Sequence, residues 1–327
     1  MRKLHGQYNP DVPNPIGEAW WTHSDTQAWL VIPGIMAIFF GLVPDVSGWL
    51  TLTIAGLAMG MMLFIMTAGF NLVFGLMGVL NFGHSVFISL GAYAGYVVVK
   101  NNIPALLSEN IYVNLGLLTT AILFAMVLVG VVAVVFERLL IRRVYHNELM
   151  QILITIGGLI VVEQLMYMAW GSENIIVPKP AALQGGWSYG NFVFEKYRIL
   201  AVVIGLVLFG SLLLTFKKTK IGLIIRAGVE NREMVEAFGY NIRLLFTAVF
   251  VGGALLAAMG GVLWSFYEEE VSGQLGSVVG CFVAALLVGL LSNYIGYVAQ
   301  DFSHYTTIAL MITVLIWRPR GLIPLNE

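Results

Sequence analysis

The chain has 327 residues, of which 59% are hydrophobic and only 11% are charged, with a formal net charge of −1. A water-soluble domain carries about 25% charged residues to wet its surface, so this composition excludes one, and the balanced charge gives no basis for binding nucleic acid. Apolar stretches of about 15 to 25 residues, without the period-two alternation of barrel strands, predict an all-α integral membrane protein, a polytopic bundle of about 8 to 10 transmembrane helices.

The chain divides into a short polar start and a long apolar remainder. Residues 1–28 lack the compact apolar core of a cleavable signal peptide and predict an N-terminal tail, in which Trp20 and Trp21 are suited to the membrane–water interface. Residues 29–327 predict one transmembrane domain. Its candidate spans are 29–49, 51–75, 80–99, 113–136, 148–170, 199–216, 245–266, 276–298 and 303–317.

Residues 69–95, GFNLVFGLMGVLNFGHSVFISLGAYAG, mix helix-breaking glycines with polar side chains at membrane depth. Interrupted backbone within a bilayer is tolerated only where it is buried in protein or lines a cavity, and polar side chains there usually face the bundle interior. We therefore predict that this segment lines the route of a polar solute, with the candidate pathway residues Asn71, Asn81, His84, Ser85, Ser89 and Tyr93. The alternative interpretation is that its asparagines and histidine only form hydrogen bonds between helices. No metal site is expected, because His84 has no His, Cys or acidic companion at ligand spacing.

Two other features of the spans have structural interpretations. Glu163 lies inside the span 148–170, where a carboxyl is costly; we favour a protonated or hydrogen-bonded structural residue over a proton relay. Small residues let helix backbones approach closely in lipid. We expect such packing at Gly91, Gly95, Gly252, Gly253, Ala257, Gly260 and Gly261.

Basic residues indicate the orientation of the chain. Thirteen of the 17 lysines and arginines lie near the N-terminus, in the loop after residue 136, in the stretch 217–244 and near the C-terminus. Because cytoplasmic loops carry the excess of basic residues, we expect these segments in the cytoplasm and the segment 171–198 outside.

The number of spans disagrees with this orientation at the C-terminus. Three spans after a cytoplasmic 217–244 stretch would leave the C-terminus outside, yet Arg318 and Arg320 are typical of a cytoplasmic end. Either one of these spans does not cross the membrane, or one crossing is absent from the sequence. The junction at Glu270-Val271 is the place where we expect a missing segment.

The stretch 217–244 is too charged to span a membrane, but it has a helical pattern. Val229, Met234, Val235 and Phe238 form a short apolar stripe, and Gly239 is suited to end a helix. This predicts a short amphipathic helix at the membrane surface that docks into a groove on a soluble partner. The alternative is a helix that lies on its own bundle or on lipid headgroups.

Enzyme chemistry finds no support, because the sequence has no Walker phosphate loop, metal-ligand cluster or nucleophile elbow. We therefore expect no enzymatic activity of its own and no cofactor. The chain's single cysteine, Cys281, also excludes an intrachain disulfide. A stand-alone secondary transporter or channel is the competing class, but it calls for paired intramembrane charges or inverted repeats.

These motifs together resemble the branched-chain amino acid ABC transporter permease family, and its LivH-type subunit in particular. The resemblance rests on Asn71-Leu72, Gly75-Leu76, Gly78, Asn81-Phe82-Gly83-His84, Leu90-Gly91-Ala92-Tyr93, residues 136–170, residues 226–262 and Arg318-Pro319-Arg320-Gly321-Leu322. In that family a further apolar segment of roughly twenty residues, enough for one span, precedes the motif found here at Gly276-Ser277. Its absence agrees with the mismatch in the number of spans.

The resemblance implies a permease subunit of a binding-protein-dependent importer in the inner membrane of a bacterium. It would move branched-chain or related small amino acids inward by ATP-driven alternating access, with urea, short amides or small carboxylate compounds as alternative substrates. The implied partners are a second permease subunit of the LivM type, two cytoplasmic ATP-binding subunits and a periplasmic solute-binding protein. The implied ATPase-coupling residues are Arg226, Glu233, Met234, Ala237, Phe238 and Gly239.

Overall fold

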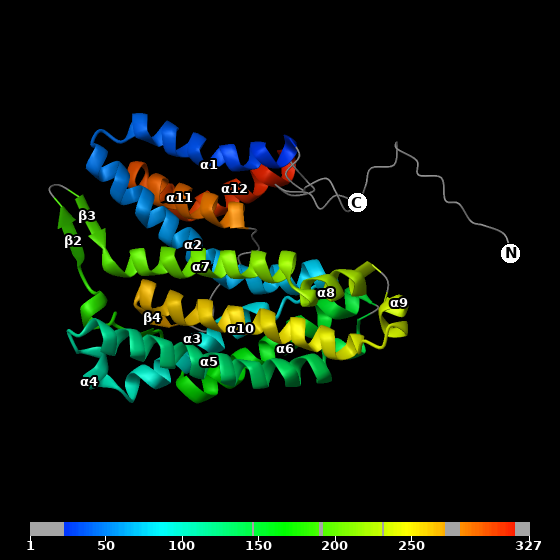
Figure 1. Cartoon of the computed structure of the whole chain (residues 1–327). Helices are drawn as coiled ribbons and strands as arrows, with labels where there is room; N and C mark the ends of the chain where they lie inside the picture. The colour runs from blue at the N-terminus through cyan, green and yellow to red at the C-terminus, as the bar shows by residue number, and fades with distance from the viewer. Residues whose placement is uncertain (1–22, 146, 190–191, 231, 272–281, 318–327) are drawn as a thin grey trace.

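The computed structural model describes residues 23–145, 147–189, 192–230, 232–271 and 282–317. The described part is a bundle of long helices with short strands at one end (Figure 1). The long helices are α1 (His23–Leu42), α2 (Val46–Met77), α3 (His84–Lys100), α5 (Ile111–Leu139), α6 (Glu148–Trp170), α7 (Lys196–Lys218), α10 (Ile242–Glu268), α11 (Phe282–Val298) and α12 (Ser303–Trp317). The shorter helices are α4 (Ile103–Leu106), α8 (Lys220–Glu230), α9 (Arg232–Ala237) and the 3-10 turns η1 (Ile141–Arg143), η2 (Ala181–Leu183) and η3 (Gln300–Phe302).

In the described part of the chain, two pairs of short antiparallel strands accompany the helices. One pair is β1 (Ile175–Ile176) with β4 (Glu270–Val271), and the other is β2 (Gly186–Tyr189) with β3 (Phe192–Glu195). In the first pair Ile175 lies opposite Val271, so a segment that precedes α7 is joined to the residues that follow α10.

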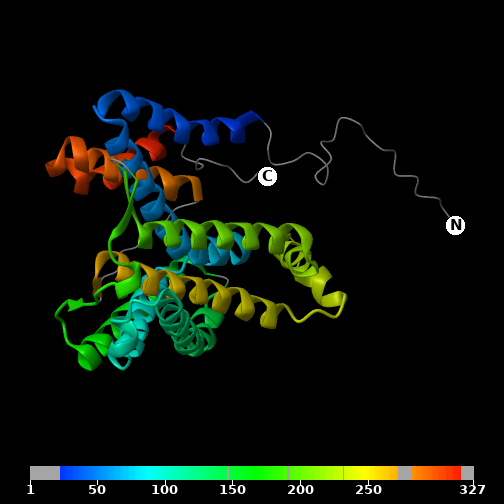
Figure 2. The ribbon, with the colours of Figure 1, turned by 60° about the vertical axis from the view of Figure 1, so that its left-hand side comes forward.

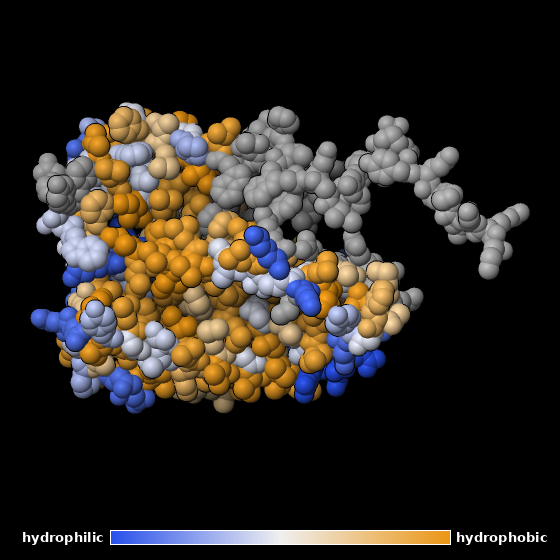
Figure 3. All heavy atoms as spheres, viewed as in Figure 1, coloured by the Kyte–Doolittle hydropathy of each residue, from blue (hydrophilic) through white to orange (hydrophobic). Residues whose placement is uncertain are grey.

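The helices have the length and surface of membrane spans. Five of them are long and apolar enough to cross a bilayer, namely Val46–Met77, Ile111–Arg143, Glu148–Trp170, Lys196–Phe216 and Ile242–Glu268, and Leu30–Leu42 and Ala284–Val298 are shorter apolar helices. Only 11% of the most apolar stretch of α7 is buried within the chain. Apolar residues cover most of the middle of the bundle, and hydrophilic residues gather mainly at its two ends (Figure 3). The predicted all-α polytopic membrane protein is confirmed.

The predicted boundary of the first span is wrong. A helix was expected over 29–49, but α1 ends at Leu42 and α2 begins at Val46. Pro44 cannot continue a helix, and the carboxyl of Asp45 accepts the N–H of Gly48 at 3.2 Å, which caps the start of α2. At the other end, α1 begins within the expected tail, of which residues 1–22 lie outside the described part.

The two ends of the bundle differ in construction. One carries β2 and β3, and we call it the hairpin end; the other carries α8 and α9, and we call it the α8–α9 end (Figures 1 and 2). The segment 171–198 folds mainly as the strands and turns of the hairpin end. The stretch 217–244 folds as α8, α9 and the residues around them, between the spans α7 and α10.

Glycines hold α10 tightly against α2 and α3, as the sequence predicts. A Cβ on Gly253 would lie 2.6 Å from the carbonyl oxygen of Gly69 on α2, and one on Gly261 only 2.0 Å from that of Ile88 on α3. Gly91 and Gly260 make equally close approaches, to Ala258 at 2.5 Å and to Met66 at 2.6 Å. The prediction is wrong for Gly252, which has no described atom within 4 Å of its added Cβ.

Helices α10 and α11 run in the same direction. In α10, Gly253 lies against Gly69 of α2, and later residues approach earlier residues of α2. In α11, Leu286 lies against Gly60 and Tyr294 bonds to Thr53, so α11 is also antiparallel to α2.

Two successive complete crossings would run in opposite directions. The mismatch expected from the number of spans therefore falls between Val271 and Phe282. The expected place of the missing segment, the Glu270-Val271 junction, is followed directly by residues 272–281, which lie outside the described residues. Helix α12 then returns from the hairpin end toward the end at which α1 begins (Figure 1).

Candidate functional site

The predicted interruption in 69–95 is present as a loop between α2 and α3. Helix α2 ends at Met77, and Gly78 follows in the left-handed conformation, with φ 62° and its N–H bonded to the carbonyl of Phe74. That conformation favours glycine. Helix α3 begins only at His84, so the span expected over 80–99 starts with a loop instead of a helix.

Side chains of α6 satisfy the backbone of this loop. The N–H of Leu80 donates to Oε1 of Gln151 at 3.1 Å, and the N–H of Phe82 donates to Oγ1 of Thr155 at 3.2 Å. Both side chains are buried. A non-helical loop within a bilayer needs such partners, because water is not there to supply them. Neither Gln151 nor Thr155 was predicted as a site residue, although two polar side chains four positions apart in an apolar span lie on one helix face.

The six candidate pathway residues lie along this loop, α2 and α3. Asn81, His84, Ser89 and Tyr93 are buried, and Asn71 and Ser85 are partly buried. His84 Nε2 lies 3.2 Å from the carbonyl oxygen of Met66 on α2, which is the interhelical hydrogen bond that the alternative interpretation describes. Tyr93 is stacked on Trp170 of α6, with ring centroids 5.0 Å apart. The six side chains are spread over several helical turns instead of converging on one point.

One of these residues has an unused hydrogen-bond donor. Asn81 is 1% exposed, and its Oδ1 accepts the N–H of Gly83 at 3.1 Å. Its Nδ2 has no hydrogen-bond partner among the described residues. A buried donor without a partner costs free energy, so a water molecule or a polar solute at this position would be stabilised.

A groove of about 540 Å³ lies between α5 and α6 on the side of the bundle. It is lined by Phe136, Leu140, Met150, Leu153, Ile154, Gly157, Gly158, Val161 and Val162. None of the six candidate pathway residues lines it. Its apolar lining suits hydrocarbon and not a polar solute.

Helix α9 presents apolar side chains at the α8–α9 end. It ends at Ala237, and Gly239, the predicted helix stop, follows two residues later with φ 87°. Val235 is 3% exposed and packs on the bundle, whereas Met234 is 47% and Phe238 75% exposed. Ala237 is also exposed. The predicted stripe is therefore divided: Val235 packs on the bundle, whereas Met234 is about half exposed and Phe238 mostly exposed.

Two of the expected coupling residues are described only in part. Arg226 lies in α8 and Glu233 in α9. Their side chains, like that of Val229, lie outside the described part.

Glu163 forms a hydrogen bond within its own helix. The hydroxyl of Tyr167 donates to Oε1 of Glu163 at 2.9 Å, one turn further along α6. This agrees with the interpretation of Glu163 as a hydrogen-bonded structural residue.

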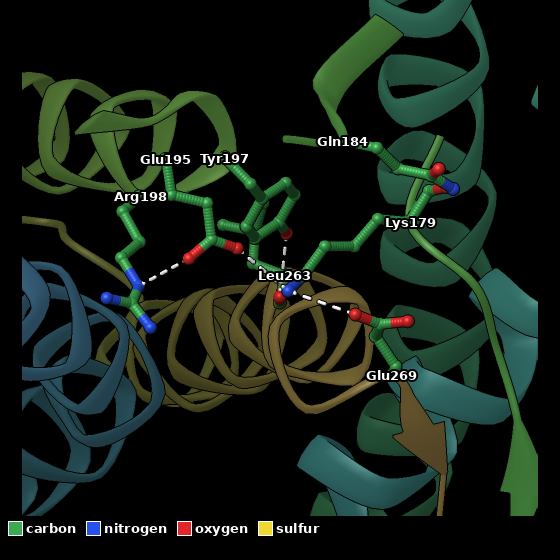
Figure 4. Close-up of polar contacts among 7 residues, drawn as sticks. All are labelled: Lys179, Gln184, Glu195, Tyr197, Arg198, Leu263 and Glu269. Atoms are coloured by element: carbon green, nitrogen blue, oxygen red, sulfur yellow. Dashed lines mark hydrogen bonds and ion pairs between the residues drawn. The ribbon is translucent and has the colours of Figure 1, made fainter. Parts of the chain in front are cut away.

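The hairpin end contains a cluster of charged residues that ties three segments together (Figure 4). Nζ of Lys179 lies 2.9 Å from Glu195, at the start of α7, and 3.1 Å from Glu269, which follows α10. Nε of Arg198 lies 2.7 Å from the second oxygen of Glu195; the two form an ion pair without the angle of a hydrogen bond. Burial lowers the pKa of Lys179, but the bonds to both carboxylates outweigh it and raise this pKa above its ordinary value.

Uncharged contacts complete this end. The hydroxyl of Tyr197 donates to the carbonyl of Leu263 on α10 at 2.7 Å (Figure 4). Asn114 of α5 is fully buried, and its Oδ1 accepts the N–H of Ala182 at 2.7 Å. The segment between α6 and α7 is thereby attached to α5 and α10 as well as to its own hairpin.

Comparison with known proteins decides the family. The family described as branched-chain amino acid transport system / permease component matches residues 52–316. The chain belongs to this family. The match takes in the interrupted loop, α8, α9 and the glycine-packed core, and it confirms the predicted resemblance. No solved structure matches.

Curated relatives point to the LivH type. The permease protein LivH of the high-affinity branched-chain amino acid transport system of Escherichia coli (strain K12) is 25% identical over 294 residues, covering 82% of this chain and 93% of the relative. The corresponding BraD protein of Pseudomonas aeruginosa is 25% identical over 307 residues, covering 86% and 97%. LivM of Escherichia coli (strain K12) is 27% identical over 312 residues, covering 82% of this chain and 69% of the relative.

The LivH alignment also bears on the missing segment. Its 294 aligned positions exceed 82% of a 327-residue chain, so the relative has residues in the aligned stretch without a counterpart here. A segment absent at the Glu270-Val271 junction would produce this difference.

Proposed function

We propose that this chain is a transmembrane permease subunit of a binding-protein-dependent ABC importer, and that it moves branched-chain or related small amino acids inward by ATP-driven alternating access. The observation that carries the proposal is the exposed apolar surface of Met234 and Phe238 on α9, placed beyond the membrane spans in a chain of this family. The α8–α9 end then lies in the cytoplasm with the N-terminus, and the hairpin end lies outside, in the inner membrane of a bacterium.

The α8–α9 end is the docking site for the ATP-binding subunits. Phe238, beyond the spans, is left 75% exposed by the described residues, and a groove on a soluble partner would bury this apolar side chain. Helix α9 leads through a short turn into α10. A displacement of α9 by a bound partner would therefore move α10, which is part of the glycine-packed core. The proposed docking residues are Arg226, Glu233, Met234, Ala237, Phe238 and Gly239.

The other partners follow from the relatives. Both LivH and LivM, named as permease proteins of one transport system, are similar to this chain. This supports a second, LivM-type permease subunit beside it. A periplasmic solute-binding protein would deliver the substrate to the hairpin end. In this assembly ATP is hydrolysed by two separate subunits, and this chain needs no cofactor and no ATPase site of its own.

The interrupted loop and α3 form the solute pathway of this subunit. The donor Nδ2 of Asn81 supports the assignment, because a polar solute passing here would meet a hydrogen-bonding group that no described residue binds. The proposed pathway residues are Asn71, Asn81, His84, Ser85, Ser89 and Tyr93. Urea, short amides and small carboxylate compounds are the alternative substrates.

Purification from the native membrane tests the proposal. We expect two ATP-binding subunits and a second permease subunit to co-purify with this chain. Vesicles containing that assembly and the solute-binding protein should accumulate labelled leucine, isoleucine or valine only when ATP is supplied. An excess of unlabelled urea, amide or carboxylate compound would compete if one of these is the substrate. Solute flux through the purified chain alone, driven by an ion gradient, would contradict the importer and support a secondary transporter or channel.

A further inference from the structure

A buried carboxyl lies where α5 ends, and none of the roles above uses it. Glu137 is 1% exposed and lies in the last turn of α5, at the α8–α9 end of the bundle. Its neighbours Phe136 and Ile141 are buried apolar residues. A carboxyl in such surroundings is costly unless hydrogen bonds compensate for lost water.

Two donors from different segments bind this carboxyl. The hydroxyl of Tyr145, which follows η1, lies 2.5 Å from Oε1 of Glu137. The hydroxyl of Thr247, in the second turn of α10, lies 3.0 Å from Oε2 and also 3.0 Å from the carbonyl oxygen of Arg243, so its one proton is shared between these two acceptors. Glu137 therefore joins α5, the residues before α6, and α10 at one point. The ring of Tyr145 also meets Phe246 of α10 edge-on, with centroids 5.8 Å apart.

The polar contacts continue from Tyr145 to the interrupted loop. Nε2 of Gln151 lies 3.1 Å from the carbonyl oxygen of Tyr145 and 3.2 Å from that of Val144. Oε1 of the same Gln151 accepts the N–H of Leu80. A series of hydrogen bonds thus leads from α10 through Glu137, Tyr145 and Gln151 to the loop between α2 and α3.

The other end of this series lies close to α9. Helix α10 begins at Ile242, where the side chain of Asn241 accepts the N–H of Leu244 at 3.1 Å and caps the helix. Thr247 is five residues further on, about 7.5 Å along the helix axis at 1.5 Å per residue. A displacement of α9 would reach Thr247 through this short capped turn.

We infer that Glu137 is a positioning residue that couples movement of the docking surface to the interrupted loop; the inference rests on the function proposed above. Apolar contacts can slide past one another, whereas a hydrogen bond to a buried carboxyl holds only within narrow limits of distance and angle. While both donors are bound, the start of α10, the end of α5 and the residues before α6 move together. Gln151 passes that movement to the backbone of the loop.

The test measures solute transported per ATP hydrolysed in vesicles that contain the complete assembly. Tyr145→Phe and Thr247→Val each remove one donor and nearly preserve volume, and we expect each to lower this ratio about fivefold, the effect of one lost hydrogen bond. In the double variant this ratio should fall little further than in the more affected single variant, because either substitution alone already interrupts the series of hydrogen bonds. Glu137→Gln should retain most of the coupling, since its amide can donate to Thr247 while its oxygen still accepts from Tyr145. Glu137→Ala should not.

Tyr167→Phe is the matched control. It removes a tyrosine–carboxyl hydrogen bond of the same kind, but the bond to Glu163 lies within a single helix and joins no segments. We expect its ratio to equal that of the wild type. A melting temperature for each variant in detergent establishes that the proteins compared are folded.

Two results would overturn the inference. One is an unchanged ratio of solute to ATP in Tyr145→Phe and Thr247→Val; the other is an equal fall in Tyr167→Phe. Either would show that Glu137 has only a structural role. The proposed function fails separately, if the wild-type assembly itself shows no ATP-dependent transport.

Discussion

The hairpin end and the α8–α9 end of this permease-family chain are completed in different ways. At the hairpin end, charged and polar groups find partners within the chain: Lys179 bonds to two carboxylates, and Asn114 and Tyr197 bond to backbone groups. At the α8–α9 end, Met234 is about half exposed and Phe238 mostly exposed, although both lie outside the membrane spans.

This difference in internal pairing between the two ends indicates which end is suited to bind a second protein. Exposed apolar residues along the spans are covered by lipid and require no partner. Exposed apolar residues lie beyond the spans at the hairpin end too, Ile176 among them at 79%. The charged and polar groups of that end, however, are paired with one another, so we take the α8–α9 end, where the described residues leave Met234 and Phe238 exposed, as the incomplete one. At the hairpin end the segment between α6 and α7 is already held by contacts within the chain, so in the proposed orientation a solute-binding protein would dock there without first ordering it.

The contrast between the hairpin end and the α8–α9 end requires one rigid core of packed helices that carries both. Gly253→Ala tests that core and has the largest expected effect. The added Cβ would lie 2.6 Å from the carbonyl oxygen of Gly69 and 2.7 Å from Val73, so α2 and α10 would have to separate. We expect a loss of about 3 kcal/mol in unfolding free energy, seen as a much lower melting temperature in detergent.

Gly252→Ala is the control on the neighbouring residue. With no described atom within 4 Å, its methyl group should be harmless or slightly stabilising, by about 0.5–1 kcal/mol in a helix interior. Equal melting temperatures for the two variants would mean that the core is loose, and the contrast between the ends would lose its basis.

The incomplete end can be tested with Met234→Ser combined with Phe238→Ser. Because both side chains are exposed, stability should change by no more than about 0.5 kcal/mol. Binding of the ATP-binding subunits should weaken by about 2 kcal/mol, the loss typical of an apolar anchor. The readout is the affinity of the purified chain for those subunits.

Ile176→Ser serves as its counterpart at the hairpin end. Ile176 is 79% exposed, so the same chemical change is made on the opposite side of the bundle. Its affinity for the ATP-binding subunits should match that of the wild type. Equal weakening by both changes would remove the distinction between the ends.

Much of the helical architecture was predictable, because the bilayer sets the length of each apolar run. The break in 69–95 was predictable too, since glycine and asparagine rarely interrupt a span without cause. The end of α1 was not, because Pro44 and Asp45 are only two residues in a long apolar stretch, and their effect depends on the cap that Asp45 makes.

The other site residues could not be predicted from the sequence because their hydrogen-bond partners are distant along the chain. Gln151 and Thr155 bind a loop more than 70 residues away, and Glu137 and Thr247 are 110 residues apart. Seen in the sequence alone, Glu137 is a charge beside Arg138 at the end of a span, where an acidic residue needs no special explanation. Its burial depends on how α5 and α10 pack, which no local pattern records.

The substitution with the smallest expected effect tests the ion pairs of the hairpin end. Lys179→Met removes the cation shared by Glu195 and Glu269, while Arg198 still pairs with Glu195. We expect a loss of about 1 kcal/mol, measured as faster cleavage of the segment between α6 and α7 by a protease. Lys196→Met is the control, because Lys196 donates only to the carbonyl of Ala182, at 3.3 Å, among the contacts described for its side chain.

The pH dependence of the same cleavage gives a second readout of Lys179. Because its pKa is raised above 10.5 in the folded chain, its contribution is present below that pH and is lost only as the pH rises through the raised value. Protection of the wild type should therefore be the same at pH 7 and pH 9, and the difference between wild type and Lys179→Met should be constant over this range. A difference that vanished by pH 9 would show that Lys179 is not held by the two carboxylates, and the hairpin end would then be no more firmly built than the α8–α9 end.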